Sequence, residues 1–349
     1  MKAAFLTGIR KVEVRDVPAP GKPGAGEALL RVDVLGVCGS DMHYFKEGRI
    51  GTQVVEYPFI VGHEFAATVE AVGDQVGDLR KGRRVAVDPL VACGQCDQCR
   101  NGRVHTCRDQ RFMGCPGQMS GAMAQYVVMP ARCCFPIPDE MTAEQAALTE
   151  PFSIALHARN LARTPECASV AILGCGPIGL CVLAALKAAD PCEVYATDLL
   201  DERLALAGRL GADWTGNAAA GDVLAAIKRT QPLGMDRVFE CAGKQETIDQ
   251  AVELLAPGGT LVLVGIPPFD RFSLDMNLFR RKELRLQCVR RQNECVQTAI
   301  DMLAEGKVNL DALVTHHFLL EQSQQAFDMV ADYRDGVVKA MIQISSETQ

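Results

Sequence analysis

The hexapeptide Gly174-Cys175-Gly176-Pro177-Ile178-Gly179 constrains the fold more than any other feature of the sequence. It fits the pattern G-x-G-x-x-G and stands between a run typical of a strand (170–173) and a run typical of a helix (177–187). Such glycines permit a tight turn and a close approach of the backbone to a ligand, and the helix start offers free N–H groups to a pyrophosphate. The pattern predicts a strand–turn–helix unit that binds a dinucleotide.

An acidic residue follows at the end of the next predicted strand. Asp198 follows Gly179 by roughly 20 residues, which is the separation typical of this motif. A carboxylate at this place binds the ribose hydroxyls and repels a 2′-phosphate, which favours NAD over NADP. The alternative is a glycine turn in a non-binding α/β domain, with Asp198 as a solvated strand end.

Strands and helices alternate from about residue 146 to residue 285, which indicates a parallel sheet. The expected strands are 170–173, 193–197, 237–241 and 260–264, and the expected helices are 177–187, 201–210 and 246–255, the last ended by Pro257-Gly258-Gly259. Earlier residues are β-rich, with strands expected at 28–34, 66–72, 84–87 and 124–129, and a helix is expected at 294–305. The length of 349 residues corresponds to about two domains.

Four cysteines form a second motif, C-x2-C-x2-C-x7-C, in a loop rich in Gly, Gln and Asp. They are Cys93, Cys96, Cys99 and Cys107. Four thiolates at this spacing suit a closed tetrahedral zinc site that orders a loop without a core of its own. An iron–sulfur cluster also takes four cysteines, and a pair of disulfides is the remaining alternative.

A third set of metal-ligand residue types is dispersed along the chain. Cys38, His63 and Glu150 each have a simpler explanation, as a strand-end hydrophobe, a capping residue and a helix-start charge. Together, one thiolate, one imidazole and one or two carboxylates make an open zinc site with a free position for water or substrate. Spacing alone does not show whether they converge.

Composition excludes several classes of protein. The formal charge of −7 gives no general attraction to nucleic acid or to anionic membranes, and basic clusters with interleaved aromatics are missing from a chain whose one tryptophan is Trp214. No apolar run is long enough to span a membrane, and charges at Arg10, Lys11 and Glu13 interrupt the N-terminal apolar stretch. The 15 cysteines are an odd number, and many lie in apolar runs. A reducing cytoplasm is therefore the expected location.

These motifs, in this order, resemble the zinc-dependent medium-chain dehydrogenase/reductase superfamily, and more narrowly its polyol (sorbitol, xylitol, L-iditol) dehydrogenase branch. The resemblance spans nearly the whole chain. The segments that carry it are Cys38-Gly39-Ser40-Asp41-Met42-His43-Tyr44, Gly48-Arg49-Ile50-Gly51, Gly62-His63-Glu64, Glu150-Pro151-Phe152-Ser153 with His157, Gly174 to Gly179, and Val264-Gly265.

The resemblance implies an α/β fold of two domains. A GroES-like β-rich catalytic domain, which includes the structural zinc lobe, is expected at residues 1–150 and 290–349, and a Rossmann domain with a doubly wound parallel sheet at 151–289. Two zinc ions per chain and NAD are the implied cofactors. The catalytic zinc residues would be Cys38, His63, Glu64 and Glu150, and which carboxylate binds directly stays open. Ser40 and His43 match positions that relay the substrate proton.

The resemblance also assigns contacts to the cofactor and the substrate. Asp198 and Arg203 match the pair that binds the ribose. The full set of expected cofactor residues is Gly174, Gly176, Pro177, Ile178, Gly179, Asp198, Arg203, Val264, Gly265, Ile266, Val289 and Arg290. The expected substrate contacts are Tyr44, Arg290 and Arg291. A homotetramer is expected, with a dimer as the alternative.

Three departures from the family pattern matter. Ala67 replaces a usual glycine, which is a mild change. The four-cysteine lobe is intact, although some animal polyol dehydrogenases lack it. Val289-Arg290-Arg291 replaces an expected Arg-Tyr pair, and an added guanidinium can pair with a carboxylate or a phosphate. Arg291 is therefore either a surface or interface charge or a contact to an anionic substrate.

The expected function is oxidation of a polyol secondary hydroxyl to the ketose, with zinc as the Lewis acid and hydride transfer to NAD. An NAD-dependent dehydrogenase of a sugar acid or a polyol phosphate is the alternative within the same mechanism. A non-zinc NADPH-dependent reductase would lack Cys38, His63, the four-cysteine loop and Asp198. Metal content and cofactor reduction would distinguish an enzyme from a binding protein without turnover or from a zinc module that binds nucleic acid. The expected partner is therefore a small molecule, and neither a nucleic acid nor a membrane.

Overall fold

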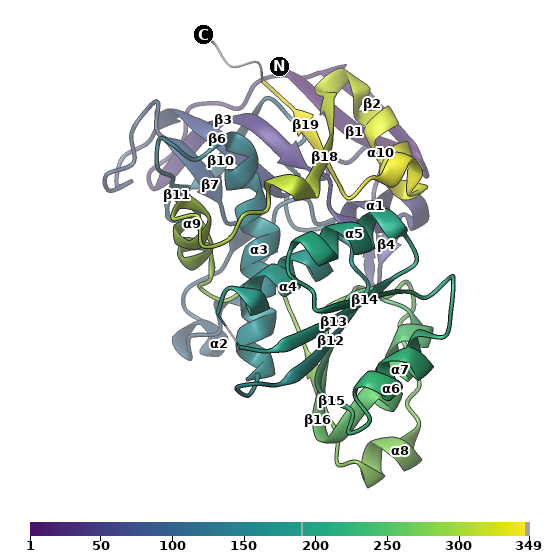
Figure 1. Cartoon of the computed structure of the whole chain (residues 1–349). Coiled ribbons are helices and arrows are strands. Elements are labelled where there is room, and N and C mark those ends of the chain that lie inside the picture. Colours follow the sequence, from purple (N-terminus) through teal and green to yellow (C-terminus); the bar gives the residue numbers. More distant parts are fainter. Residues whose placement is uncertain (190, 346–349) are drawn as a thin grey trace. The chain divides into compact units, whose positions relative to one another are not determined.

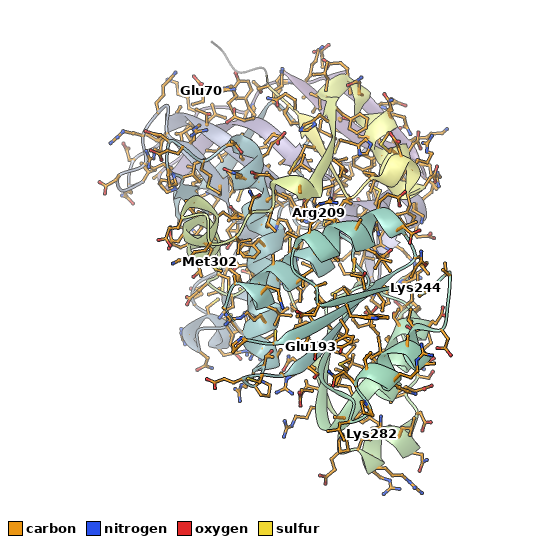
Figure 2. All side chains as sticks on the ribbon, viewed as in Figure 1. Glu70, Glu193, Arg209, Lys244, Lys282 and Met302 are labelled. Atoms are coloured by element: carbon orange, nitrogen blue, oxygen red, sulfur yellow. The ribbon has the colours of Figure 1, made fainter. Side chains whose placement is uncertain are left out.

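The computed structural model describes residues 1–189 and 191–345, and the chain divides into two compact units. The first unit comprises residues 1–150, 296–306 and those from 314 onward, and the second comprises Pro151–Cys295 and Lys307–Leu313. Both combine strands and helices, so the predicted α/β class is confirmed (Figure 1). Charged side chains such as Glu193, Arg209 and Lys244 lie on exposed faces of the second unit (Figure 2).

Strands dominate the first unit. Its main sheet contains β3 (Glu27–Gly36), β6 (Glu64–Val72), β7 (Arg84–Val87), β10 (Tyr126–Pro130), β11 (Cys134–Pro136), β18 (Val314–Leu319) and β19 (Lys339–Gln343). The order is β11-β7-β6-β3-β19-β18, and β10 pairs with the first half of β3. Three two-stranded sheets join β1 (Lys2–Gly8) to β2 (Lys11–Asp16), β4 (Arg49–Ile50) to β5 (Gln53–Val54), and β8 (Leu90–Val91) to β9 (Arg111–Phe112).

The register of three neighbouring strands sets up the site described below. Gly36, at the end of β3, pairs with Glu64 of β6 on one side and with Met341 of β19 on the other. Leu30, Val32 and Leu35 of β3 are buried in the core of this unit. The ends of β3, β6 and β19 therefore meet at one edge of a well-packed sheet, although β3 lies near the start of the chain and β19 near its end.

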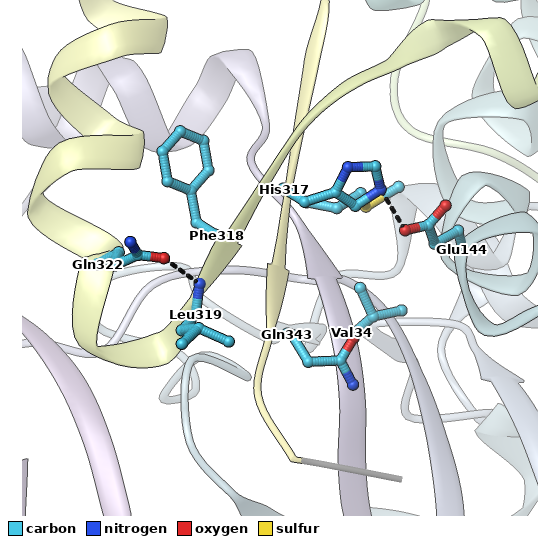
Figure 3. Close-up of a pocket in the computed structure, with 8 residues that line it drawn as sticks. Val34, Glu144, His317, Phe318, Leu319, Gln322 and Gln343 are labelled. Atoms are coloured by element: carbon cyan, nitrogen blue, oxygen red, sulfur yellow. Dashed lines mark hydrogen bonds and ion pairs between the residues drawn. The ribbon is translucent and has the colours of Figure 1, made fainter.

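Five helices accompany this sheet, namely α1 (Gly39–Glu47), α2 (Asp97–Arg100), α3 (Ala143–Ala162), α9 (Val296–Ala304) and α10 (Ser323–Ala331). Phe45 of α1 packs edge-on against Phe327 of α10, with ring centroids 5.3 Å apart. The edge strand β18 is tied to α3 by His317, whose Nε2 lies 2.7 Å from Glu144 Oε1, beside a surface pocket of about 150 Å³ (Figure 3).

The second unit is a doubly wound parallel sheet. Its strands are β12 (Ser169–Leu173), β13 (Glu193–Asp198), β14 (Trp214–Asn217), β15 (Met235–Glu240), β16 (Leu255–Leu263) and β17 (Arg285–Cys288), in the order β14-β13-β12-β15-β16-β17. The helices are α4 (Pro177–Lys187), α5 (Asp201–Arg209), α6 (Val223–Thr230), α7 (Gln245–Leu254) and α8 (Met276–Arg281). Because crossovers between parallel strands are right-handed, the reversal of strand order after β14 puts α4 and α5 on one face and α6 and α7 on the other (Figure 1).

The predicted helix at 177–187 is confirmed with the same bounds, and the predicted strands of this unit agree within one or two residues except at the start of β16. There the expected end of the preceding helix is confirmed within one residue, since α7 ends at Leu254, and Pro257-Gly258-Gly259 lie at an irregularity in the pairing of β16 with β15. β16 begins at Leu255, directly after α7, and contains these residues. Lys282 makes the abrupt helix end possible, since its ammonium donates to the carbonyls of Val252, Glu253 and Leu255 at 2.8–3.1 Å.

Two further findings concern the whole chain. Within the described residues, no helix has the length and the apolar character that crossing a membrane requires. All of the cysteines belong to the described part of the chain, and each of them is free of disulfides there.

Candidate active site

The ends of two adjacent strands in the first unit bring a thiol, an imidazole and a carboxylate together. Cys38 follows β3 and is the N-cap of α1, His63 precedes β6, and Glu64 is the first residue of β6. One ligand atom from each of the three lies within 4.8 Å of the others. His63 and Glu64 are buried and Cys38 is partly buried. Sulfur, nitrogen and oxygen donors at this spacing fit a zinc ion that keeps an open position.

Asp41 organises this cluster, and it was not among the predicted site residues. Its carboxylate accepts hydrogen bonds from Cys38 N (3.1 Å) and Gly62 N (3.3 Å), and Oδ1 lies 3.7 Å from His63 Nδ1. Burial raises the pKa of Asp41, and nearby His63 opposes that rise. A carboxylate that accepts a hydrogen bond from a ligating histidine fixes the orientation of its ring. At 3.7 Å, Asp41 Oδ1 lies beside His63 Nδ1 but beyond hydrogen-bond distance. A sequence signal for Asp41 was available. The residue stands three positions after Cys38, where it completes a capping box.

Lys339 is a second residue that the sequence reasoning missed. Its ammonium contacts the Glu64 carboxylate and donates to Val37 O at 3.2 Å. Lys339 is only 1% exposed and Glu64 only 3%. The two residues are 275 positions apart, so no local pattern could have paired them. A fully buried ammonium is tolerated only with such a partner.

The site contains more acidic groups than basic ones, and this excess bears on whether a metal cation fits there. Burial raises the pKa of the Cys38 thiol well above its ordinary value, the charges of Glu64, Asp41 and Glu150 raise it further, and Lys339 opposes them. Glu150 is buried within α3 and is not one of the three clustered ligands. One lysine faces three carboxyl groups and a thiol, and a divalent cation suits this donor set.

The remaining predicted residues of this region lie on α1. Ser40 Oγ donates to Cys38 Sγ at 3.3 Å, so the hydroxyl lies directly beside the clustered thiol. His43 is partly buried one turn further along the helix. Tyr44 is buried, and its hydroxyl donates to Gln53 Oε1 at 3.0 Å.

The four-cysteine loop brings its sulfur atoms together. Sγ atoms of Cys93, Cys96, Cys99 and Cys107 all lie within 4.8 Å of one another. Backbone N–H groups of Arg108 and Cys99 lower the pKa of Cys96 to about 6, whereas burial and the neighbouring thiols raise the pKa of Cys99 to about 12. Arg108 ties the loop by a bidentate pair with Asp97. Such a set fits a closed tetrahedral zinc site.

The glycine fingerprint lies where the sequence places it, between β12 and α4. Gly176 is the N-cap of α4 and Pro177 is its first residue, so α4 directs its free N–H groups at the turn. Gly174 has φ +100°, and a Cβ there would come within 3.0 Å of Ala242. Only glycine fits that position.

Asp198, the last residue of β13, faces this turn. Its Oδ2 accepts from Cys175 N at 2.7 Å, and its Oδ1 accepts from Leu199 N and Leu200 N. Arg203 Nη1 lies 3.9 Å from Asp198 Oδ2. The predicted ribose pair and the fingerprint therefore form one cluster at the carboxyl edge of the sheet, where open α/β sheets bind their ligands.

The other predicted contacts follow the last strands of the sheet. Val264, Gly265 and Ile266 come directly after β16, and the amide of Val289, after β17, donates to Leu263 O at 2.9 Å. Arg290 is exposed, and Arg291 adopts φ +52°. These expected cofactor residues thus share the carboxyl edge of the sheet with the fingerprint.

Comparison with known proteins gives the same assignment for both units. Residues 24–139 match the alcohol dehydrogenase GroES-like domain, and residues 177–305 match the zinc-binding dehydrogenase family. Sorbitol dehydrogenase of Bacillus subtilis (strain 168) is 37% identical, over 98% of this chain and 97% of its own length. L-idonate 5-dehydrogenase of Vitis vinifera is 33% identical, over 94% and 91%.

A solved structure shows the same fold over the full length. An oxidoreductase/dehydrogenase of unknown specificity from Escherichia coli superposes with a TM-score of 0.93 at 32% identity, and the match covers 99% of both chains. With the two family matches and these relatives along nearly the whole chain, the predicted resemblance is confirmed. The chain belongs to the zinc-binding alcohol dehydrogenases of the medium-chain type, in the branch that contains the sorbitol dehydrogenases.

Proposed function

We propose that this enzyme oxidises a secondary hydroxyl of a polyol to the ketose and transfers the hydride to NAD. The observation that carries the proposal is the Cys38–His63–Glu64 cluster, in a chain whose second unit carries the fingerprint and Asp198. Identity of 37% with a sorbitol dehydrogenase supports the polyol as the substrate class.

Cys38, His63 and Glu64 would hold the catalytic zinc, and Glu150 would act from beside them. When bound, zinc supplies a Lewis acid that lowers the pKa of the substrate hydroxyl, and NAD supplies the hydride acceptor. Asp41 lies beside the imidazole of His63, and Lys339 holds the Glu64 carboxylate by one oxygen. The spacing of the ligand atoms supports Glu64, rather than Glu150, as the direct ligand.

Ser40 and His43 would carry the substrate proton to solvent. Ser40 Oγ lies 3.3 Å from Cys38 Sγ, next to the proposed metal position. His43, three residues later on α1, is partly exposed. Residues three apart on a helix lie on the same face, which supports a relay from hydroxyl to imidazole.

The four cysteines of the second cluster would hold a structural zinc that orders residues 93–107. Asp198 and Arg203 would bind the adenosine ribose, and the turn from Gly174 to Gly179 would hold the pyrophosphate. Val264, Gly265, Ile266, Val289 and Arg290 would face the nicotinamide half. We assign the catalytic domain to residues 1–150 and 290–349 and the cofactor domain to 151–289, and the two compact units support this division except at 290–295 and 307–313.

A sugar acid or a polyol phosphate is the second candidate substrate. Arg290 and Arg291 favour it, because a guanidinium group can bind a carboxylate or a phosphate in a bidentate way. The 33% identity with an L-idonate 5-dehydrogenase supports the same class. Tyr44 would contribute to substrate binding in either case.

We propose a homotetramer, with a dimer as the smaller assembly, in a reducing cytoplasm. Leu286 is exposed on β17, the edge strand of the second sheet, and an exposed edge strand is a template for pairing with another chain. Cysteines that form no disulfide in the described part of the chain support a reducing compartment. Light scattering on the purified protein measures the assembly.

The test of the function is NAD reduction followed by absorbance across neutral polyols, polyol phosphates and aldonic acids, with NADP and a chelator-stripped sample in parallel. Turnover of sorbitol or xylitol with NAD, lost on stripping, supports the proposal. Turnover of the anionic substrates alone would show that the substrate is a sugar acid or a polyol phosphate and not a neutral polyol. Arg291 would then be the first residue to substitute. His63→Ala should abolish zinc-dependent turnover, and undiminished activity of that variant would remove His63 from the site.

A further inference from the structure

The second sheet has a buried glutamate side chain at its C-terminal edge, and this residue is not among the site residues assigned above. Glu240 is the last residue of β15 and is 1% exposed. Its Oε1 accepts hydrogen bonds from Ala242 N (2.9 Å), Gly243 N (2.7 Å) and Thr247 Oγ1 (2.7 Å). These donors belong to the turn and the first helical turn that follow it, so one oxygen atom fixes the whole connection from β15 to α7.

The segment that Glu240 fixes, residues 241–247, packs against two loops of the proposed cofactor site, namely the glycine fingerprint and the loop after β16. A Cβ on Gly174 would lie 3.0 Å from the Cβ of Ala242, so the fingerprint packs directly against the turn. A Cβ on Gly265 would lie 2.8 Å from Glu240 Oε2, so the loop after β16 packs against the carboxylate itself. The amides of Val264 and Gly265 also donate to Glu240 O at 2.9 Å. Glu240 therefore contacts one loop by its main chain and fixes another by its side chain.

The topology places these loops on one half of the dinucleotide site. Asp198, the proposed ribose residue, ends β13, on one side of β12. Glu240 ends β15, on the other side of β12, beyond the point where the strand order reverses. A dinucleotide in such a sheet lies across this point, with its two nucleotides on opposite sides. The loops fixed by Glu240 therefore belong to the nicotinamide half.

We infer that Glu240 is a positioning residue whose carboxylate fixes the segment 241–247, which packs against the loop 264–266, and thereby preorganises the nicotinamide half of the cofactor site. The inference rests on the proposed NAD site. Glu240 acts through the backbone of these loops and has no contact with the reacting atoms. Its substitution should weaken ligands that reach the nicotinamide half and spare ligands that occupy only the adenosine and pyrophosphate half.

The test compares NADH with ADP-ribose, which lacks the nicotinamide ring, by titration calorimetry on the full zinc-loaded protein. Glu240→Ala leaves three donors without their acceptor, and we expect NADH to bind about 10- to 100-fold more weakly, against less than about 3-fold for ADP-ribose. Glu240→Gln keeps an oxygen acceptor and should recover most of the lost affinity. Glu246→Ala, which removes an exposed carboxylate in the same helix turn, should change neither affinity.

Two further measurements separate positioning from general damage. Amide hydrogen exchange of Ala242 and Gly243 in the ligand-free protein should accelerate in Glu240→Ala, while exchange in the strand β13 stays as in the wild type. Thr247→Val keeps the carboxylate and removes one donor, so it should weaken NADH selectively, by about 3- to 10-fold, even where Glu240→Ala does not fold.

The outcomes are distinct. Selective weakening of NADH in Glu240→Ala or Thr247→Val supports the inference. Unchanged NADH affinity, or equal weakening of NADH and ADP-ribose, overturns it while leaving the proposed function intact. A wild-type protein that binds neither ligand overturns the proposed cofactor site, and the inference falls with it.

Discussion

Lys339 and Glu64 show how a single buried pair carries both stability and metal chemistry. The lysine supplies a positive charge among Glu64, Asp41 and Glu150. Removing one partner of a buried pair leaves the other as an uncompensated charge in a poorly solvated place, which costs far more than the pair itself contributes. A zinc ion bound at Cys38, His63 and Glu64 would change this balance, because a divalent cation would neutralise the same carboxylate.

The first prediction concerns this pair. Lys339→Met should lower the free energy of unfolding of the metal-free protein by about 3–5 kcal/mol, and the loss should be smaller in the zinc-loaded protein. Urea denaturation of both forms measures it. Lys339→Arg should retain most of the stability. Lys2→Met, which breaks the exposed pair with Glu321, should leave the midpoint unchanged. A metal-free Lys339→Met protein as stable as the wild type would show that Glu64 needs no counter-charge.

Glu240 carries a pH dependence of its own, which gives the second prediction. Burial raises its pKa above the ordinary 4.5, against the opposing hydrogen bonds from Thr247, Gly243 and Ala242. A carboxyl group with a raised pKa in the folded state contributes stability that is fully present below pH 4.5 and is lost as the pH rises through the raised pKa. The stability of the wild type relative to Glu240→Gln should therefore decrease as the pH rises above 4.5. A difference that stays constant with pH would contradict this.

At the scale of elements, sequence reasoning succeeded where local pattern decides the structure. The helix at 177–187 has a proline at its start and an unbroken apolar face, and its bounds were predicted without error. It failed where distant groups decide. The early start of β16 at Leu255 was not predicted, and this junction with α7 depends on Lys282, which lies 27 to 30 residues away. The long helix α3 was not predicted, since Pro151 interrupts its pattern, and Glu150 lies inside that helix and not at its start.

The candidate site divides in the same way. The four-cysteine motif and the fingerprint are local, and their spacing alone indicated what the structure brings together. Cys38 and His63 were candidates by residue type, and the resemblance added Glu64. Spacing could not show that they converge, because the pairing of β3 with β6 is what unites them. Asp41 and Lys339 were missed. The first acts through hydrogen bonds to backbone, and the second reaches the site from β19.

The third prediction concerns the four-cysteine loop as an element. Of residues 93–107 only His105 and Cys107 are buried, so the loop has almost no core and depends on its metal. Cys107→Ser should lower the zinc content by about one ion per chain and make the loop the first site of protease cleavage. Cys167→Ser, which changes an exposed cysteine outside the cluster, is the matched control. Unchanged zinc content in Cys107→Ser would exclude this site as a metal centre.

At the scale of the whole molecule, the chain combines two units with separate cores and separate ligands. The core of the first unit is built around β3 and β6, and that of the second around β15, β16 and α7. The chain leaves the first unit within α3 and returns to it through α9 and β19. The proposed metal sites belong to the first unit and the proposed dinucleotide site to the second, so each ligand stabilises its own unit first.

The last prediction uses the single tryptophan as a reporter of one unit. Trp214 lies on β14 of the second unit, with its ring 5.8 Å from that of Tyr195. In urea, tryptophan fluorescence should therefore follow the second unit alone, whereas far-ultraviolet circular dichroism follows both. ADP-ribose at 100 times its Kd should stabilise the fluorescence-detected transition by about 2.7 kcal/mol. A chelator should shift mainly the part of the circular dichroism transition that comes from the first unit. Fluorescence and dichroism curves that coincide, and that shift equally with either treatment, would show that the two units unfold as one.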